Sequence, residues 1–294
     1  SILVNKSFGR YTYDPESPIV VNESIYDVAS LTKVLSTTPV VMKLIQKKLL
    51  SLDYFLSDFY KEFEYGDKKN ITIRHLLTHT SGLPAYVEYY KNDYIKNKED
   101  IINDIINLDL IYKPDTKTEY SDLGMILLSD IIEIITSSNL NTLSTRYFYN
   151  PLGMSNTLFN PSELLLSRII PTENDTYFRN RLLQGEVHDE NAYIMGGISG
   201  HAGLFSNATD IGIISKFFLD EGVFLGRRYL KKELINTFTS KKENPVFSDR
   251  TIGWDTPSQN GKSSAGDYFS KKSYGHLGFT GTSVWIDPEK KIII

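Results

Sequence analysis

Hydrophobic residues recur at helical spacing through most of the chain. From residue 30 to residue 50 this spacing predicts a long helix that is interrupted or bent near Pro39. A stop signal at Gly82 and Pro84 follows a second helical stretch. Together the expected helices cover residues 30–50, 71–79, 101–110, 123–135 and 211–219. The middle of the chain is therefore expected to be mainly helical.

Strand patterns appear near the two ends instead. Residues 2–21 alternate apolar and polar positions around a turn at Tyr13–Pro15, which is typical of a β-hairpin. Residues 283–286 also have a strand pattern, and the apolar run 292–294 follows a turn at 287–290. These last two are expected to form a hairpin whose second strand stops at the end of the chain.

Strands at both ends with helices between them predict a mixed α+β fold. We expect an antiparallel sheet closed by distant segments, flanked by helices and carrying an inserted, mainly helical lobe. A length of 294 residues suits a single domain with two lobes. The expected boundaries place residues 1–50 and 225–294 in the sheet lobe and residues 51–224 in the helical lobe.

Composition excludes several classes of function. The net charge of −4 is spread without a basic block, so no nucleic-acid partner is expected. There is no cysteine, which excludes disulfides, thiolate metal ligands and a cysteine nucleophile. No apolar run reaches the ~18 residues of a membrane span. The chain opens at Ser1 without a leader, and the missing initiator Met favours a leader outside this sequence.

The start of the first predicted helix carries candidate chemistry. Ser30 and Lys33 stand three positions apart, which places a hydroxyl and an amine on one helix face. A partly desolvated lysine can hold a pKa low enough to take the serine proton, and amides at the helix N-terminus can stabilise an acyl oxygen. Taken alone, a Ser-x-x-Lys pattern is common surface polarity.

A second motif lies just before the helix that begins at Leu123. Tyr120 is followed by Ser121 and Asp122, in a loop where side chains can converge on a cleft. A phenol beside an ammonium is stabilised as phenolate, so Tyr120 and Lys33 together can act as general base and then as acid. The plainer interpretation is that Ser121 or Asp122 caps the helix.

The third motif is the glycine-rich segment 275–282, which leads into the strand at Ser283. Gly278 and Gly281 let a substrate approach the backbone closely, as at an edge strand that docks a ligand. A bulge or a tight bend would explain the same glycines.

In this order the three motifs resemble those of the serine β-lactamase and penicillin-binding-protein superfamily. That pattern is Ser-x-x-Lys, then Tyr-x-Asn or Ser-x-Asn, then Lys-Thr-Gly. Residues 25–33 are similar to the phrase around the nucleophile of class C enzymes and their esterase relatives, and residues 75–84 and 200–206 resemble two further family phrases. The resemblance covers nearly the whole chain and implies a β-lactamase/transpeptidase-like fold.

The resemblance implies a role for each matching residue. Ser30 would be the acylated nucleophile, with Lys33 and Tyr120 as its proton partners. The backbone amides of Ser30 and Phe279 would form the oxyanion hole. The substrate-binding positions would be Asp122, His276, Gly278 and Thr280.

Two of these positions depart from the family pattern. Asp122 stands where the motif has Asn, and His276 stands where it has Lys. Both touch substrate recognition. Because an unperturbed histidine has a pKa of about 6.5, the charge of His276 is expected to switch near neutrality. Carboxylate-bearing substrates should then lose affinity as the pH rises from about 5.5 to 8, whereas neutral esters should not.

Other signals have weaker interpretations. His75 and His79 are four positions apart on a helix but lack the Glu of a zinc-protease motif, so structural histidines are expected. Residues 196–200 superficially resemble a nucleophile elbow, but that motif would need Gly at position 201, where the chain has His201. Residues 188–190 are expected in an exposed loop, with metal ligation or cleft lining as the alternative. His201 receives no role.

The sequence therefore predicts a serine hydrolase that acts through an acyl-enzyme on a β-lactam, a D-alanyl peptide or a related ester or amide. No metal or organic cofactor is implied. The alternatives are a small-ester carboxylesterase on the same fold and a non-catalytic penicillin-recognising sensor. The resemblance also implies a small-molecule or peptidoglycan-derived substrate, a periplasmic or other extracytoplasmic location, and a further strand and C-terminal helix beyond Ile294.

Overall fold

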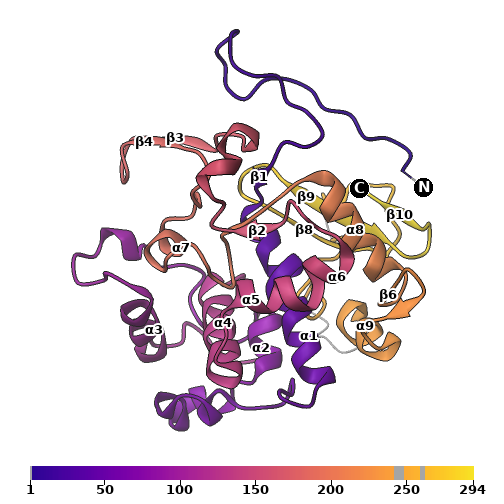
Figure 1. Ribbon diagram of the computed structural model, residues 1–294. Helices are drawn as coiled ribbons and strands as arrows, with labels where there is room; N and C mark the ends of the chain where they lie inside the picture. Colours follow the sequence, from indigo (N-terminus) through magenta and orange to yellow (C-terminus); the bar gives the residue numbers. More distant parts are fainter. Residues whose placement is uncertain (1, 242–247, 259–261) are drawn as a thin grey trace.

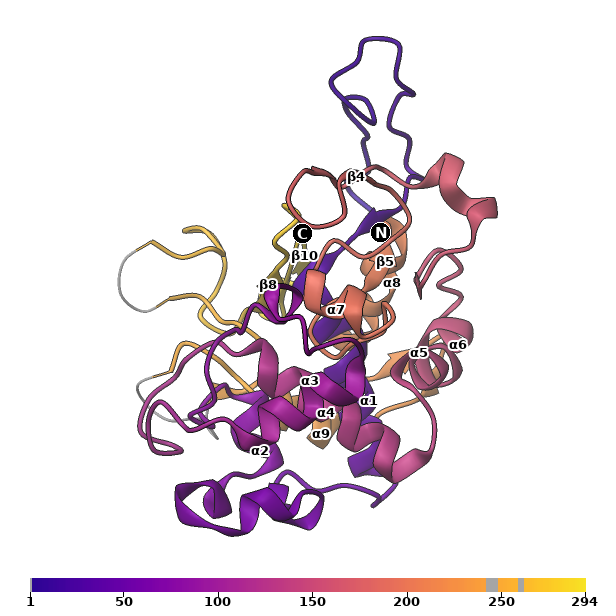
Figure 2. The same cartoon turned by 90° about the vertical axis from the view of Figure 1, so that its left-hand side faces the viewer.

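A computed structural model describes residues 2–241, 248–258 and 262–294 (Figure 1). Most helices gather at one end of the molecule and the two larger sheets at the other, and the view from the side agrees (Figure 2). Strand β1 (Tyr26–Asp27) lies among the sheets, and the chain runs from it into helix α1 (Thr38–Gln46) at the helical end. The segment that contains Ser30 therefore connects the two parts.

The predicted helices after residue 70 are confirmed. They are α2 (Ile73–Leu77), α3 (Lys98–Asn107), α4 (Asp122–Thr136) and α8 (Ala208–Leu219). Among the described residues, the helices that were not predicted are α5 (Leu140–Ser144), α6 (Asn150–Leu152), α7 (Glu190–Ile194) and α9 (Lys232–Thr239). Single 3₁₀ turns lie at Leu56–Asp58, Lys61–Glu64, Gly66–Asn70, Tyr89–Lys91 and Glu163–Arg168, and a π-helical segment at Thr145–Tyr149.

The predicted helix over residues 30–50 is not one regular α-helix. It begins as a 3₁₀ turn at Ala29–Leu31, widens into a π-helical segment at Lys33–Thr37 and becomes α-helical only in α1. Pro39 lies in the first turn of α1, where its missing N–H and fixed φ fit a helix. The change of winding therefore comes from the π-helical segment, a feature that is frequent at functional sites.

The mixed α/β class and the antiparallel pairing are confirmed, but the main strands are divided between two three-stranded sheets. One sheet has the order β1-β5-β2, with β5 at Leu204–Ser206 and β2 at Leu158–Phe159. The other has the order β10-β9-β8, with β8 at Tyr274–Leu277, β9 at Ser283–Asp287 and β10 at Ile292–Ile293. Strands β9 and β10 are the hairpin predicted at the end of the sequence.

Two small hairpins complete the described strands: β3 (Glu173–Asp175) with β4 (Arg181–Leu183), and β6 (Val223–Phe224) with β7 (Arg227–Arg228). Strand β1 pairs with β5, although β5 belongs to the part of the sequence that was expected to form the helical lobe. Strand β1 has only two residues, and the 3₁₀ turn that follows it leads the chain toward α1.

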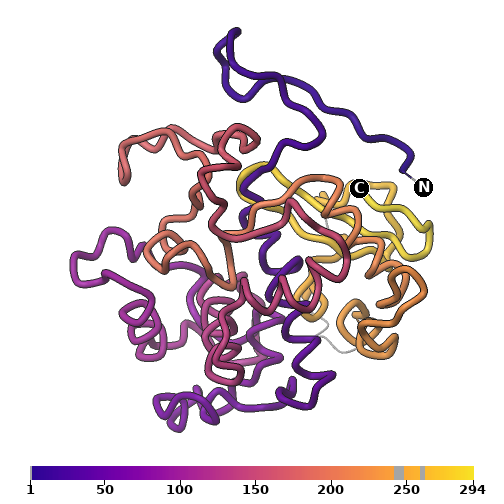
Figure 3. The backbone as a smooth tube through the Cα atoms, viewed as in Figure 1, coloured from indigo at the N-terminus to yellow at the C-terminus, as the bar shows by residue number. Residues whose placement is uncertain are grey.

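The hairpin expected over residues 2–21 is present only in outline. A single bridge joins Arg10 to Ile19, and apolar side chains such as Leu3 and Phe8 are largely exposed. This arm projects from the body of the molecule, as the backbone trace shows (Figure 3).

One large apolar cluster fills the body. It draws buried residues from α1 to α4, from α8 and from the β8–β10 sheet. Trp254 and Phe218 lie deep in it, with ring centroids 5.2 Å apart. Within the described ranges, no single helix is long and apolar enough to cross a membrane; α4 and residues 140–152 reach that length and composition only as a pair bent by 75°.

Candidate active site

Ser30 and Lys33 meet as the sequence predicts. Lys33 Nζ donates a hydrogen bond to Ser30 Oγ at 2.9 Å, and a second one to the His201 carbonyl oxygen at 2.9 Å. Ser30 is half-buried, whereas Lys33 is only 1% exposed. The 3₁₀ turn and the start of the π-helical segment keep the two side chains on one side of the chain. The hydroxyl and the amine are thus held in direct contact.

Asp122 determines the charge of Lys33. Its Oδ1 lies 2.8 Å from Lys33 Nζ. Burial alone would lower the pKa of Lys33, but the Asp122 carboxylate and Tyr120 outweigh burial and raise that pKa above its ordinary value. The expectation that desolvation leaves a low pKa on Lys33 is therefore wrong. Asp122 was expected to bind substrate, but in this site it is the ion-pair partner of Lys33.

Tyr120 lies beside the same ammonium. Lys33 Nζ is 4.9 Å from the centre of its ring, and the Tyr120 hydroxyl interacts with both Lys33 and Ser30. Burial raises the pKa of Tyr120, and the nearby Lys33 charge offsets this only in part. The expected stabilisation as phenolate is wrong, because burial wins. Tyr120 is a neutral phenol in the resting site, able to donate and accept a hydrogen bond.

The plainer interpretation of the second motif, a helix cap, is confirmed. Ser121 caps α4, because its Oγ accepts from the Gly124 amide at 3.3 Å. The Ser121 amide donates to His79 Nδ1 at 3.1 Å, and the His79 ring lies 4.8 Å from the Tyr120 ring. Burial holds the pKa of His79 well below its ordinary value. His79 is therefore a neutral structural histidine that supports Tyr120.

The turn between β8 and β9 lies against the segment before Ser30. A Cβ at Gly278 would come within 2.7 Å of the Val28 carbonyl oxygen, so only glycine fits this approach. Thr280 Oγ1 donates a hydrogen bond to the Asp27 carbonyl oxygen at 2.7 Å. The Thr280 hydroxyl, which was expected to bind substrate, therefore already has a partner within the protein. Phe279 is 84% exposed at the tip.

His276 lies near the site but is enclosed. It is 3% exposed, its Nδ1 is 2.7 Å from the Leu277 carbonyl oxygen, and its ring is 5.8 Å from the Tyr120 ring. Burial lowers the pKa of His276 below its ordinary value, with the Lys33 and Arg250 charges adding to the effect. The expected charge switch near neutrality is therefore wrong, because the ring loses its proton in more acidic solution.

Asp189 and His201 also lie at the site, which agrees with the alternative that residues 188–190 line the cleft; the sequence assigned neither residue a role. His201 Nε2 lies 2.8 Å from Asp189 Oδ1, and its Nδ1 lies 2.8 Å from Ser199 Oγ. Burial would raise the pKa of Asp189, but His201 and the Ala192 amide outweigh it and lower the pKa to about 2. The segment 188–190 is thus packed against the site instead of forming an exposed loop.

Donor atoms of Asp122, Asp189 and His201 lie within 4.8 Å of one another, close enough to surround a metal ion. Asp122 already faces the Lys33 ammonium, and Asp189 already holds the His201 ring. A divalent cation there would have to compete with the Lys33 charge. These residues fit a hydrogen-bonded charge network better than a metal site.

Arg250 is a second cation that the sequence did not mark. Its guanidinium lies 4.9 Å from the centre of the Tyr120 ring, and it forms an ion pair with Asp255. Its charge also acts on His79 and His276. The site therefore carries positive charge beside Tyr120, although His276 is neutral at neutral pH.

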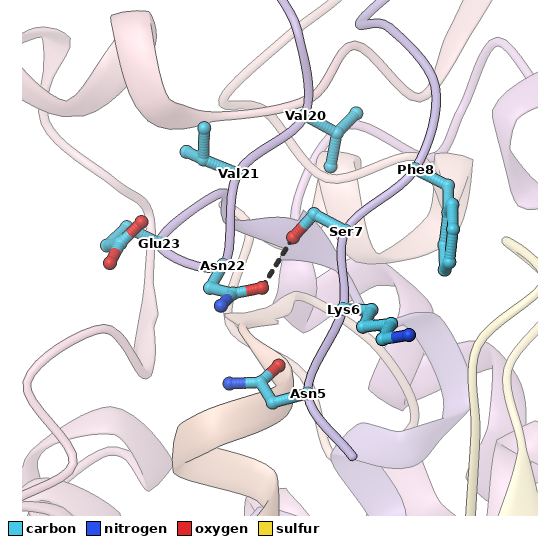
Figure 4. Close-up of a pocket in the computed structure, with 8 residues that line it drawn as sticks. All are labelled: Asn5, Lys6, Ser7, Phe8, Val20, Val21, Asn22 and Glu23. Carbon is cyan, nitrogen blue, oxygen red and sulfur yellow. Dashed lines mark hydrogen bonds between the residues drawn. The ribbon is translucent and has the colours of Figure 1, made fainter.

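A shallow hollow lies elsewhere, on the N-terminal arm, between residues 5–8 and residues 20–23 (Figure 4). Ser7 Oγ donates to Asn22 Oδ1 across it at 2.6 Å. None of the predicted site residues lines it, so the Ser30 cluster is the candidate active site.

Comparison with known proteins identifies relatives of this chain. N-acetylmuramyl-L-alanine amidase of Bacillus subtilis (strain 168) is 32% identical over 90% of this chain and 65% of its own length. A protein of Escherichia coli (strain K12) named "Putative D-alanyl-D-alanine carboxypeptidase" is 32% identical over 95% of this chain and 70% of its own length. The chain thus spans about two thirds of these relatives.

A similar fold is found in the octameric penicillin-binding protein homologue from Pyrococcus abyssi. The TM-score is 0.75, with 22% identity, over 100% of this chain and 66% of that one. The family model described as Beta-lactamase matches residues 2–294. With a match across nearly its whole length, this chain belongs to the β-lactamase family.

Proposed function

We propose that this chain is a serine hydrolase of the β-lactamase and penicillin-binding-protein type, with Ser30 as the covalent nucleophile. The observation that carries the proposal is the 2.9 Å contact between Ser30 Oγ and Lys33 Nζ. A serine hydroxyl becomes a strong nucleophile only when a neighbour accepts its proton. Tyr120 beside this pair completes the group that the family resemblance implies.

The charge states indicate how the proton moves. Because Lys33 is a cation paired with Asp122, the terminal acceptor is the Asp122 carboxylate. As Ser30 Oγ forms its bond to the substrate carbonyl carbon, its proton passes to Lys33 while Lys33 passes one to Asp122. Tyr120 then protonates the leaving group and regains a proton from Lys33, which takes back the proton held by Asp122. The acyl-enzyme is released by water along the reverse path.

The amides of Ser30 and Phe279 are the proposed oxyanion donors. Preorganised backbone amides stabilise the negative charge that develops on the acyl oxygen, and removing one such donor typically costs 10²–10³ in kcat. They belong to opposite sides of the contact between the β8–β9 turn and the Ser30 segment.

The proposed substrate is a peptidoglycan-derived amide, which implies action outside the cytoplasm. Support comes from the names of the amidase and carboxypeptidase relatives. Arg250 supplies a cation for an acidic substrate beside Tyr120. A small neutral ester is the second candidate, because the family lysine is replaced by His276, which is neutral at neutral pH.

The test is intact-protein mass spectrometry after incubation with a labelled penicillin, an N-acetylmuramyl peptide and a p-nitrophenyl ester in separate reactions. We expect a covalent adduct or product with at least one of them, and neither with Ser30→Ala. Labelling of the Ser30→Ala variant would contradict the assignment. Turnover identifies a hydrolase, whereas a lasting penicillin adduct without turnover identifies a penicillin-recognising sensor.

A further inference from the structure

The two proposed oxyanion amides come from distant parts of the sequence. Ser30 follows β1, whereas Phe279 lies in the turn between β8 and β9. These strands belong to different sheets, so the pairing within either sheet does not set the spacing of the two amides. Another contact has to fix it.

Asp27 contacts the Ser30 side of this junction. Its Oδ1 accepts a hydrogen bond from the Ala29 amide at 2.8 Å. Ala29 has a φ of 45°, an uncommon value for a residue other than glycine, directly before Ser30. The Asp27 carboxylate thus holds the strained residue from which the Ser30 amide projects.

Asp27 contacts the Phe279 side as well. Its carbonyl oxygen accepts from Thr280 Oγ1 at 2.7 Å, one residue after Phe279. Its Oδ2 accepts from the His188 amide at 2.7 Å, and the His188 ring lies 5.5 Å from the Phe279 ring. One residue, 2% exposed, therefore contacts the neighbours of both amides.

We propose that Asp27 is the positioning residue of the oxyanion hole, because its carboxylate and carbonyl join the Ala29, His188 and Thr280 segments. This inference rests on the proposed function. Asp27 touches no reacting atom, so it acts through the placement of the Ser30 and Phe279 amides.

The charge of Asp27 gives the inference a pH signature. Burial raises the pKa of Asp27 to about 6, and the nearby Asp189 charge adds to this effect. The His188 and Ala29 amides and the His188 charge act in the opposite direction but do not outweigh burial. Above this pH both carboxylate oxygens accept amide protons; below it one oxygen carries a proton and is a poorer acceptor. Activity should therefore rise with pH through about 6.

The first test compares Asp27→Asn with wild type on a p-nitrophenyl ester. Asparagine keeps one acceptor but turns an N–H₂ group toward the second amide. We expect kcat to fall by about tenfold to a hundredfold, the effect of a small misplacement, with KM changed less than twofold. The acid limb near pH 6 should disappear.

The second readout is affinity for a small arylboronic acid, whose tetrahedral adduct on the serine occupies the oxyanion hole. In Asp27→Asn it should weaken by the same factor as kcat. Thr280→Val removes the hydroxyl that donates to the Asp27 carbonyl oxygen and should shift both values the same way by a smaller factor. Asp210→Asn is the matched control, because Asp210 is also 2% exposed and accepts from the Asn156 amide at 2.7 Å.

Loss of activity in Asp27→Asn with a changed KM and unchanged boronate affinity would overturn the positioning role, as would a retained acid limb. An equal loss in Asp210→Asn would reduce the effect to general destabilisation. Failure of wild type to form any Ser30 adduct would instead contradict the proposed function.

Discussion

Asp122 is the single residue that most changes the chemistry expected from the family pattern. An asparagine at this position could not carry a charge, whereas the carboxylate lies 2.8 Å from Lys33 Nζ in a site where that nitrogen is fully buried. A buried ammonium is costly unless paired, so the two charges stabilise each other. Lys33 is then ready to donate a proton but needs Asp122 in order to accept one.

The variant Asp122→Asn tests this proton path. With the carboxylate gone, Lys33 has no terminal acceptor at neutral pH, and kcat/KM at pH 7 should fall by about 10² to 10⁴, the range for general acid–base catalysis. The same change removes the main influence that raises the pKa of Lys33. Activity should therefore recover in alkaline solution as neutral Lys33 appears. The measurement is kcat/KM against pH for both proteins.

A pH profile in Asp122→Asn that keeps the wild-type shape at a lower level would mean that Asp122 binds substrate only. Asp130→Asn is a suitable control, because Asp130 is also paired with a lysine, Lys98, at 3.0 Å, and has no contact with Ser30.

The order of the three motifs allowed Ser30, Lys33 and Tyr120 to be predicted from the sequence, and the three side chains lie together in the folded site. The charge states were not readable. They depend on Asp122 and on full burial, which no local pattern records. Arg250 reaches the site through tertiary packing and follows no distinctive motif. His201 lies in the recognised phrase 200–206, but its pairing with Asp189 also depends on tertiary packing.

The β8–β9 hairpin is the element that carries Phe279, and its packing leaves no room for a side chain at Gly275. A Cβ there would come within 2.2 Å of the Val284 carbonyl oxygen and 2.6 Å of the Trp285 ring. The Gly275 backbone also pairs with Asp255 on its other side, with both N···O distances at 2.9 Å. Strand β8 is thus held between two neighbours.

Gly275→Ala should push β8 away from β9 and displace the Phe279 turn. We expect a loss of about 1–3 kcal/mol in the free energy of unfolding, as for other overpacked sites, together with a lower kcat. Gly212→Ala is the matched control, because Gly212 lies in α8 with open space around it. That change should stabilise the protein by up to about 1 kcal/mol and leave kcat unchanged. Urea denaturation and ester hydrolysis provide the two measurements.

If Gly275→Ala proves as stable and as active as wild type, the hairpin has more freedom than its contacts indicate.

Among the elements, long apolar stripes made α3, α4 and α8 predictable. Helices α5 and α7 have five residues each and were missed because so short a helix shows no clear hydrophobic periodicity. Helix α2 is equally short, but the stop signal at Gly82 and Pro84 follows it. The division into two sheets was also missed, since strand pairing between distant segments leaves no mark in either one.

Over the whole molecule, ionised Asp27 lowers the stability of the fold that it organises. Its folded pKa is about 6, against about 4 in an unfolded chain. Because the folded value is raised, its contribution to stability is fully present below pH ~4 and is lost as the pH rises through about 6. Two units correspond to about 3 kcal/mol.

The free energy of unfolding of wild type, relative to Asp27→Asn, should therefore fall by about 2 kcal/mol between pH 4 and pH 7. The difference between the two proteins cancels the opposite contribution of Asp189, whose pKa is lowered to about 2. Urea denaturation at several pH values gives the comparison. A constant difference would show that Asp27 does not titrate in this range, and the acid limb of activity would then need another source.

The π-helical segment at Lys33–Thr37 holds one residue more than an α-helix would use for the same stretch. Deleting that residue would restore regular winding, but it would rotate everything before it by about 100° around the axis of α1. Ser30 and Lys33 would stay together, yet both would turn away from Asp122 and His201, which other segments hold in place. Residues 30–38 should therefore tolerate substitutions better than a deletion. A relative that lacks one residue in this stretch is expected to have lost the hydrolase activity.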